Sequence, residues 1–134
     1  KLYFTDTGLA CSLLGIRRSA ELANSHFRGA LFENYVVAEL MKQKFNSGSS
    51  TNLYYWRDNK GIEVDVLLDQ GQKITPIEIK SAQTFQEDYI KPMKQWNKFS
   101  EQSGGIFLYD GELEYKRKDE IVIKNWRSIN KIKL

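Results

Sequence analysis

Three acidic residues and a lysine lie close together in the stretch from Ile62 to Lys80. Glu63 and Asp65 alternate with apolar residues, and after a turn Glu78 and Lys80 also alternate with apolar residues. This alternation predicts a β-hairpin with one aliphatic face and one acidic face. Carboxylates that share a face repel one another unless a cation neutralises them, and a divalent metal ion is a suitable cation.

The turn predicts the register of this hairpin. With a loop at Gln70-Gly71, or a four-residue loop around it, Leu68 opposes Lys73. Asp65 then lies diagonal to Glu78, at about 7–8 Å. The alternative interpretation is a surface hairpin with a solvated polar face, whose ion pairs stabilise the fold little.

A further carboxylate is predicted on the helix that precedes the hairpin. Apolar residues recur at threes and fours from residue 25 to 44, which indicates a helix that contains Glu33. Its neighbours on the same face are Ala30, Val37 and Leu40. A carboxylate in such surroundings needs a cation, a metal-bound water or a donor as its partner. Alternatively, Glu33 reaches solvent or pairs with Arg57 or Lys80.

The rest of the sequence predicts the strands and helices that position these residues. Strands are predicted at 2–5, 52–58, 62–68, 73–80, 106–109, 113–117 and 121–123. Helices are predicted at 7–14, 25–44 and 91–101, with a last helical turn at 126–132, a hairpin turn at Asp110-Gly111 and an ambiguous segment at 17–24. The predicted fold class is α/β (α+β), with a mixed central sheet flanked by helices and a C-terminal β-hairpin extension.

Length and composition narrow the class of protein. The 134 residues suit one domain, residues 1–134, that is long enough to bury most of its apolar surface without disulfide bonds or structural metal ions. A single cysteine, Cys11, and a single histidine, His26, argue against a disulfide, a Cys/His zinc site and a Ser-His-Asp triad. No signal peptide or membrane span is present in the sequence, so we expect a cytoplasmic protein without membrane contact.

The net charge of +3 is concentrated at one end of the chain. Residues 1–111 balance thirteen basic against thirteen acidic side chains, so the excess lies in residues 112–134. Basic residues that are candidates for contact with nucleic acid are Arg57, Lys116, Arg117 and Lys118. The alternative is that this charge simply forms a solvated surface.

Aromatic residues crowd the strand that precedes the hairpin. Tyr54, Tyr55 and Trp56 follow one another directly. Such residues can form a platform on which nucleic-acid bases stack. Aromatic residues on a strand more often belong to the core, and core packing is the interpretation we favour here.

The hairpin motif resembles that of a known enzyme superfamily. Asp65, followed after a turn by Glu78-x-Lys80, is similar to the core of the PD-(D/E)xK nucleases, which have the restriction-endonuclease-like fold. The proline in the motif's name is absent, at a position that varies in that superfamily. The resemblance implies that Asp65, Glu78 and the carbonyl of Ile79 hold Mg²⁺ or Mn²⁺. It also implies that Lys80 positions or deprotonates the attacking water and that Glu33 holds a second metal ion or its water.

A second resemblance covers about 80 residues. The chain is similar to an uncharacterised domain at the C-terminus of bacterial and archaeal AAA-type P-loop ATPases. The matching landmarks are YFTDTGLA from Tyr3, GALFENYVVAEL from Gly29, YYWRD from Tyr54, EVDVLL from Glu63 and PIEIKS ending at Ser81. The resemblance implies that an ATPase module precedes Lys1 and is the part that binds ATP, because no phosphate-binding loop motif occurs here.

Two functions follow from these patterns. The first is a metal-dependent nuclease that hydrolyses phosphodiester bonds in nucleic acid, with DNA favoured over RNA. The second is a non-catalytic module that targets the attached ATPase to nucleic acid or to a partner protein.

Overall fold

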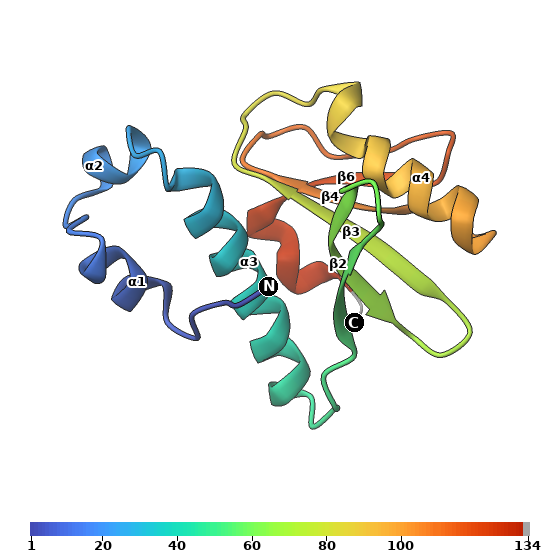
Figure 1. The fold of residues 1–134 in the computed structure, drawn as a ribbon, viewed down its shortest axis with the longest axis horizontal. Helices are drawn as coiled ribbons and strands as arrows, with labels where there is room; N and C mark the ends of the chain where they lie inside the picture. The colour runs from blue at the N-terminus through green and yellow to red at the C-terminus, as the bar shows by residue number, and fades with distance from the viewer. Residues whose placement is uncertain (133–134) are drawn as a thin grey trace.

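A six-stranded mixed sheet forms the centre of the molecule (Figure 1). The computed structural model describes residues 1–132. The strands are β1 (Leu53–Arg57), β2 (Glu63–Asp69), β3 (Ile74–Lys80), β4 (Gly105–Tyr109), β5 (Tyr115–Lys116) and β6 (Ile121–Asn125). They lie in the order β1-β2-β3-β4-β6-β5, in which the β3–β4 and β4–β6 pairs are parallel and the others antiparallel.

Helices cover both faces of this sheet. The helices are α1 (Thr7–Leu13), α2 (Ser19–Ala23), α3 (Arg28–Asn46) and α4 (Lys91–Ser100), with 3₁₀ turns η1 (Glu87–Ile90) and η2 (Trp126–Lys131). The sheet is covered by α3 and α4, and α1 and α2 lie beyond α3. In Figure 1, α3 and α4 lie on opposite sides of the sheet. The predicted fold class and the C-terminal hairpin, β5–β6, are confirmed. Among residues 1–132, no helix has both the length and the apolar character needed to cross a bilayer.

Two apolar clusters fix the central strands between these helices. The α3 cluster consists of Val36, Val37, Leu40, Val66, Leu68, Ile77, Ile79, Leu108, Ile129 and Ile132. The Trp96 cluster consists of Val64, Leu67 and Trp96, with Trp56 and Ile74 packed against it. The middle five residues of β2 and of β3 are therefore all buried, unlike a surface hairpin with one solvated face.

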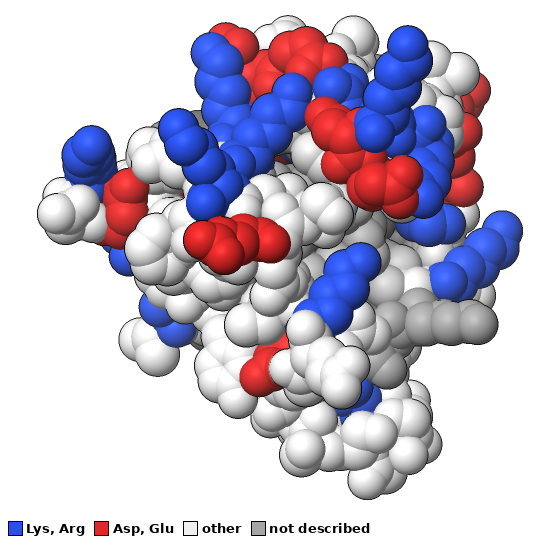
Figure 2. All heavy atoms as spheres, turned by 90° about the vertical axis from the view of Figure 1, so that its right-hand side faces the viewer, with Lys and Arg blue, Asp and Glu red and all other residues white. Residues whose placement is uncertain are grey.

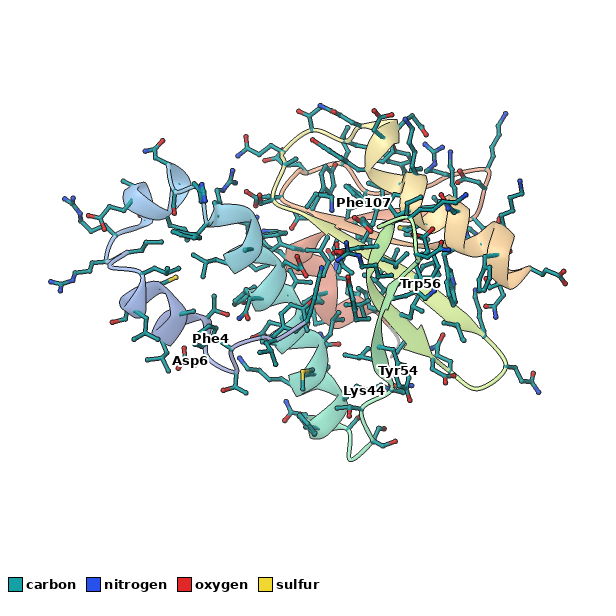
Figure 3. All side chains as sticks on the ribbon, viewed as in Figure 1. Phe4, Asp6, Lys44, Tyr54, Trp56 and Phe107 are labelled. Atoms are coloured by element: carbon teal, nitrogen blue, oxygen red, sulfur yellow. The ribbon has the colours of Figure 1, made fainter. Side chains whose placement is uncertain are left out.

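The N-terminal segment is held by a side chain instead of a strand, so the predicted strand at 2–5 is wrong. Asn34 on α3 accepts from the Phe4 N–H at 2.7 Å and donates to the Phe4 carbonyl at 3.0 Å. The buried amide thus satisfies both backbone groups that a neighbouring strand would otherwise pair. Asp6 then caps α1 by accepting from the Leu9 N–H, and Figure 3 labels Phe4 and Asp6 beside α1.

The hairpin turn lies one residue later than predicted. Val66 pairs with Ile77 and Leu68 with Thr75, so the predicted pairing of Leu68 with Lys73 is wrong by two residues. A hydrogen bond from the Gln70 N–H to the Lys73 carbonyl closes the loop, in which Gly71 has φ +83°. Because the shift is even, no residue of β3 changes face relative to β2.

A β-bulge in β2 breaks the predicted alternation. Tyr54 pairs with Leu67 and Trp56 with Val64, so two steps along β1 match three along β2. The extra residue falls at Asp65-Val66, and both Val64 and Leu67 consequently pack in the Trp96 cluster. The prediction of a single aliphatic face is therefore wrong for the first strand of the hairpin, because Val64 and Val66 pack in different clusters. Bulges re-aim side chains, and this one occurs at the candidate aspartate.

The segment after β4 also differs from the prediction. Asp110-Gly111 is not a hairpin turn, because β4 and β6 run parallel and a longer connection joins them. Asp110 accepts instead from the indole N–H of Trp126 at 2.8 Å and pairs with Arg28. These contacts hold η2, the predicted last helical turn, against α3.

The aromatic strand is only partly core. Trp56 lies toward α4 (Figure 3), where its ring meets those of Trp96 and Phe99. Tyr54 is 57% exposed. Core packing therefore holds for Trp56 and fails for Tyr54, which lies on the edge strand β1 beyond the reach of these rings.

Two glycine substitutions should have opposite effects on stability. A Cβ on Gly111 would overlap the ring of Tyr109 and the carbonyl of Gln83, whereas a Cβ on Gly29 in α3 meets no heavy atom nearer than 3.9 Å. Gly111→Ala should destabilise the fold by about 1–3 kcal/mol through overpacking. Gly29→Ala should stabilise it by up to about 1 kcal/mol through helix propensity. Urea denaturation of both variants checks this contrast, and equal effects would contradict it.

Candidate functional site

The candidate site lies where β2 and β3 separate. The strands are paired from the turn as far as Val66 and Ile77. One step further, the buried carboxylate of Asp65 accepts the Ile79 N–H at 3.0 Å through Oδ2. A side-chain oxygen therefore takes a backbone donor that the hairpin ladder leaves free. This bond fixes Asp65 in the gap between the strands.

Glu78 and Lys80 face the same carboxylate. Lys80 Nζ lies 2.5 Å from Glu78 Oε1 and 3.6 Å from Asp65 Oδ2. The Glu78 side chain is only 4% exposed, and its Oε2 has no hydrogen-bond partner within residues 1–132. A buried carboxylate oxygen without a partner is costly, so this atom is suited to receive a cation or a proton.

Glu33 reaches the cluster from α3. Its Oε1 accepts from the hydroxyl of Tyr3 at 2.6 Å and from Lys1 Nζ at 2.9 Å. The same ammonium group lies 3.1 Å from Asp65 Oδ1. The structure thus brings together all four predicted charged residues, with Glu33 linked to Asp65 through Lys1.

Burial and like charge act together on Glu78. Burial, followed by the charge of Asp65, raises the pKa of Glu78 to about 8, against the opposing effect of Lys80. For Lys80, burial alone would lower the pKa, but the charges of Asp65 and Glu78 outweigh it and raise the pKa. Without a metal ion, Lys80 is consequently a protonated counter-ion at neutral pH instead of a base.

The two lysines also explain why the cluster is not a finished metal site. Among the described residues, no three carboxylate, cysteine or histidine side chains are arranged to hold one metal ion. Lys1 and Lys80 lie between the carboxylates that would be its ligands. The unpaired Oε2 of Glu78 fits a divalent ion, and the role of the Ile79 carbonyl stays a prediction.

The basic residues predicted to contact nucleic acid lie in ion pairs or away from the site. Arg57 pairs with Glu63 at 3.2 Å, and Lys116 pairs with Glu120. Arg117 pairs with two acidic residues, Glu87 and Asp119. Lys118 is exposed beyond β5, the edge strand furthest from β1. Figure 2 shows basic and acidic side chains interspersed on the upper part of one face, with no uniformly basic surface there.

Two residues near the site, Lys1 and Tyr3, were missed by sequence reasoning, and Glu63 was recognised only as a carboxylate of the hairpin. Lys1 and Tyr3 come from a segment assigned only as a strand, and Glu63 lies 3.6 Å from the ammonium group of Lys1. The Lys1 ammonium also lies 5.1 Å from the ring centroid of Tyr55. The spacing of Lys1 and Tyr3 by two residues was the available signal, because extended backbone points both side chains the same way.

Glu78 should make the stability of the metal-free protein depend on pH. Its pKa in the folded state, about 8, lies above the ordinary value of 4.5, so the folded state binds the proton more tightly. The corresponding stability is present in full below pH 4.5 and is lost as the pH rises through 8. Glu78→Gln should therefore lose less stability than the wild type between pH 5 and 8.

Urea denaturation with a chelator present checks this expectation. Glu112→Gln is the matched control, because Glu112 is exposed. Parallel pH profiles for the wild type and Glu78→Gln would contradict the assignment.

Comparison with known proteins shows which family the chain belongs to. Uncharacterized protein Mb2031c of Mycobacterium bovis and uncharacterized protein Rv2008c of Mycobacterium tuberculosis are each 32% identical to the chain over 84 residues. The match covers 63% of this chain and 18% of each relative, so the chain spans a small part of their length. No solved structure matches the chain. The family model described as Domain of unknown function (DUF4143) matches residues 28–129, and the chain therefore belongs to that family.

Proposed function

We propose that this domain binds Mg²⁺ or Mn²⁺ and hydrolyses phosphodiester bonds in nucleic acid, in the manner of the PD-(D/E)xK nucleases. The observation that carries the proposal is the buried, unpartnered Oε2 of Glu78 beside Asp65 and Lys80. A buried carboxylate oxygen without a partner is costly to the fold, and a cation at this position would offset that cost. The mixed sheet with helices on both faces also supports a restriction-endonuclease-like core.

Each residue of the cluster has a role in this proposal. Asp65 and Glu78 hold the metal ion, with Asp65 kept in place by the Ile79 N–H. The ion would supply charge stabilisation at the attacked phosphate and a more acidic bound water. Lys80 would position or deprotonate that water, and Glu33 would hold a second metal ion or its water.

We further propose that the domain works as part of a longer AAA-type ATPase and acts on DNA. The resemblance of the sequence landmarks supports this proposal. The length of the mycobacterial relatives is consistent with it, because 84 aligned residues make up only 18% of each.

A non-catalytic targeting module is the second candidate function. One observation favours it: Lys1 and Lys80 already neutralise the carboxylate cluster without any metal ion. In that case the cluster would be a polar network that fixes the N-terminal segment and the two strands. Metal binding separates the two candidates.

Divalent metal ions should stabilise the wild-type fold. At a hundredfold excess over Kd, binding to the folded state alone adds about 2.7 kcal/mol, which corresponds to a rise in Tm of about 10 °C for a chain of this size. Thermal denaturation with and without Mn²⁺ measures this. Asp65→Asn should abolish the rise, and an unchanged wild-type Tm would favour the targeting module.

Lys80→Met should lower the rate of nucleic-acid cleavage while keeping metal binding. The variant keeps the length of the side chain but loses its charge, and loss of a group that takes part in proton transfer typically lowers a rate about 10²- to 10⁴-fold. The assay follows cleavage of labelled DNA and RNA with Mn²⁺, and calorimetry measures metal binding. Equal residual cleavage in the wild type and the variant would identify a contaminant and count against the proposal.

A further inference from the structure

The N-terminal segment delivers a cation to the centre of the carboxylate cluster. Lys1 Nζ lies 2.9 Å from Glu33 Oε1, 3.1 Å from Asp65 Oδ1 and 3.6 Å from Glu63 Oε2. Its side chain is 27% exposed, and its ammonium group also lies over the ring of Tyr55. An ammonium group with three carboxylates and an aromatic face around it occupies a position suited to a metal ion.

The backbone that carries Lys1 is anchored, so this placement does not depend on the ammonium group alone. Asn34 binds both backbone groups of Phe4, and its amide also donates to Thr7 Oγ1 at 2.9 Å. Tyr3 donates to the same Glu33 oxygen that Lys1 contacts. The segment is therefore fixed at two points within three residues of Lys1.

The contacts of Lys1 overlap the proposed metal-binding groups at Asp65, and at Glu33, which is proposed to hold a second metal ion or its water. Lys1 takes one oxygen of Asp65, while Lys80 and the Ile79 N–H share the other. Both oxygens of Asp65 are thus engaged before any metal ion arrives. A divalent ion that binds Asp65 and Glu33 has to replace the ammonium group of Lys1 as their counter-charge.

We propose that Lys1 is a resident counter-ion that competes with the divalent metal ion for Asp65 and Glu33, and so sets the metal affinity of the site. The inference rests on the proposed function, because it concerns the same metal ion. Displaced from the carboxylates, the ammonium group is free to contact a phosphate of the substrate. Metal binding and release of the Lys1 side chain are thereby coupled.

Lys1→Gln tests this proposal by isothermal titration with Mn²⁺, independently of any cleavage assay. Removing the competitor should tighten Mn²⁺ binding by about 5- to 150-fold, the usual range of coupling between two bound groups. Without metal the variant should have a lower Tm than the wild type, because Glu33 and Asp65 lose their shared cation. Mn²⁺ should restore that Tm.

Two control variants make the result specific. Lys1→Arg keeps the charge and should keep wild-type affinity within a few-fold. Lys42→Gln removes a lysine from α3 that pairs with Glu39. It should leave Mn²⁺ affinity unchanged.

The outcomes separate this inference from the proposed function. Equal Mn²⁺ affinity in the wild type and Lys1→Gln, with binding lost in Asp65→Asn, would overturn only the role of Lys1. Weaker binding by Lys1→Gln would overturn it as well, since it would show that Lys1 supports the metal site. No Mn²⁺ binding by any variant would overturn both the inference and the proposed function.

Discussion

The hydrogen bond from the Ile79 N–H to the Asp65 carboxylate determines how the rest of the site is built. It stands where the β2–β3 ladder stops, and it lets the strands diverge without leaving that donor unpaired. The bulge at Asp65-Val66 gives the carboxylate its direction. Buried apolar clusters on both faces then hold the two strands in place, so the gap between them is a fixed feature of the fold.

Burying this much negative charge imposes a second constraint. Asp65 and Glu78 are nearly inaccessible to water, and Glu33 is half-buried beside them. The fold balances these groups with two lysines from distant parts of the chain and with a raised pKa at Glu78. The network is not fully satisfied among the described residues, because Glu78 Oε2 has no hydrogen-bond partner, and an unpaired polar group is costly in such a buried setting.

Local patterns were sufficient to predict most of the elements and the charged residues of the cluster. Alternation in the hairpin singled out Asp65, Glu78 and Lys80, and helical spacing singled out Glu33. The predicted register was wrong because Gly71, with its positive φ, fits more than one position in a short hairpin loop. The predicted loop placed it second, after Gln70, whereas the observed loop places it first, before Gln72. The bulge and the approach of Lys1 to Asp65 depend on tertiary packing, the latter across 64 residues, and no local pattern records them.

The anchoring of Phe4 by Asn34 has a consequence for the geometry of the N-terminal segment. An extended residue spans about 3.3 Å, so the three steps from Phe4 back to Lys1 form a tether of about 10 Å. The length of this tether limits how far the Lys1 backbone can lie from Phe4. Removing one residue from it would shorten the reach and also turn the Lys1 side chain to the opposite side of the backbone. The length of chain between Phe4 and Lys1 therefore sets how far the ammonium group reaches into the carboxylate cluster.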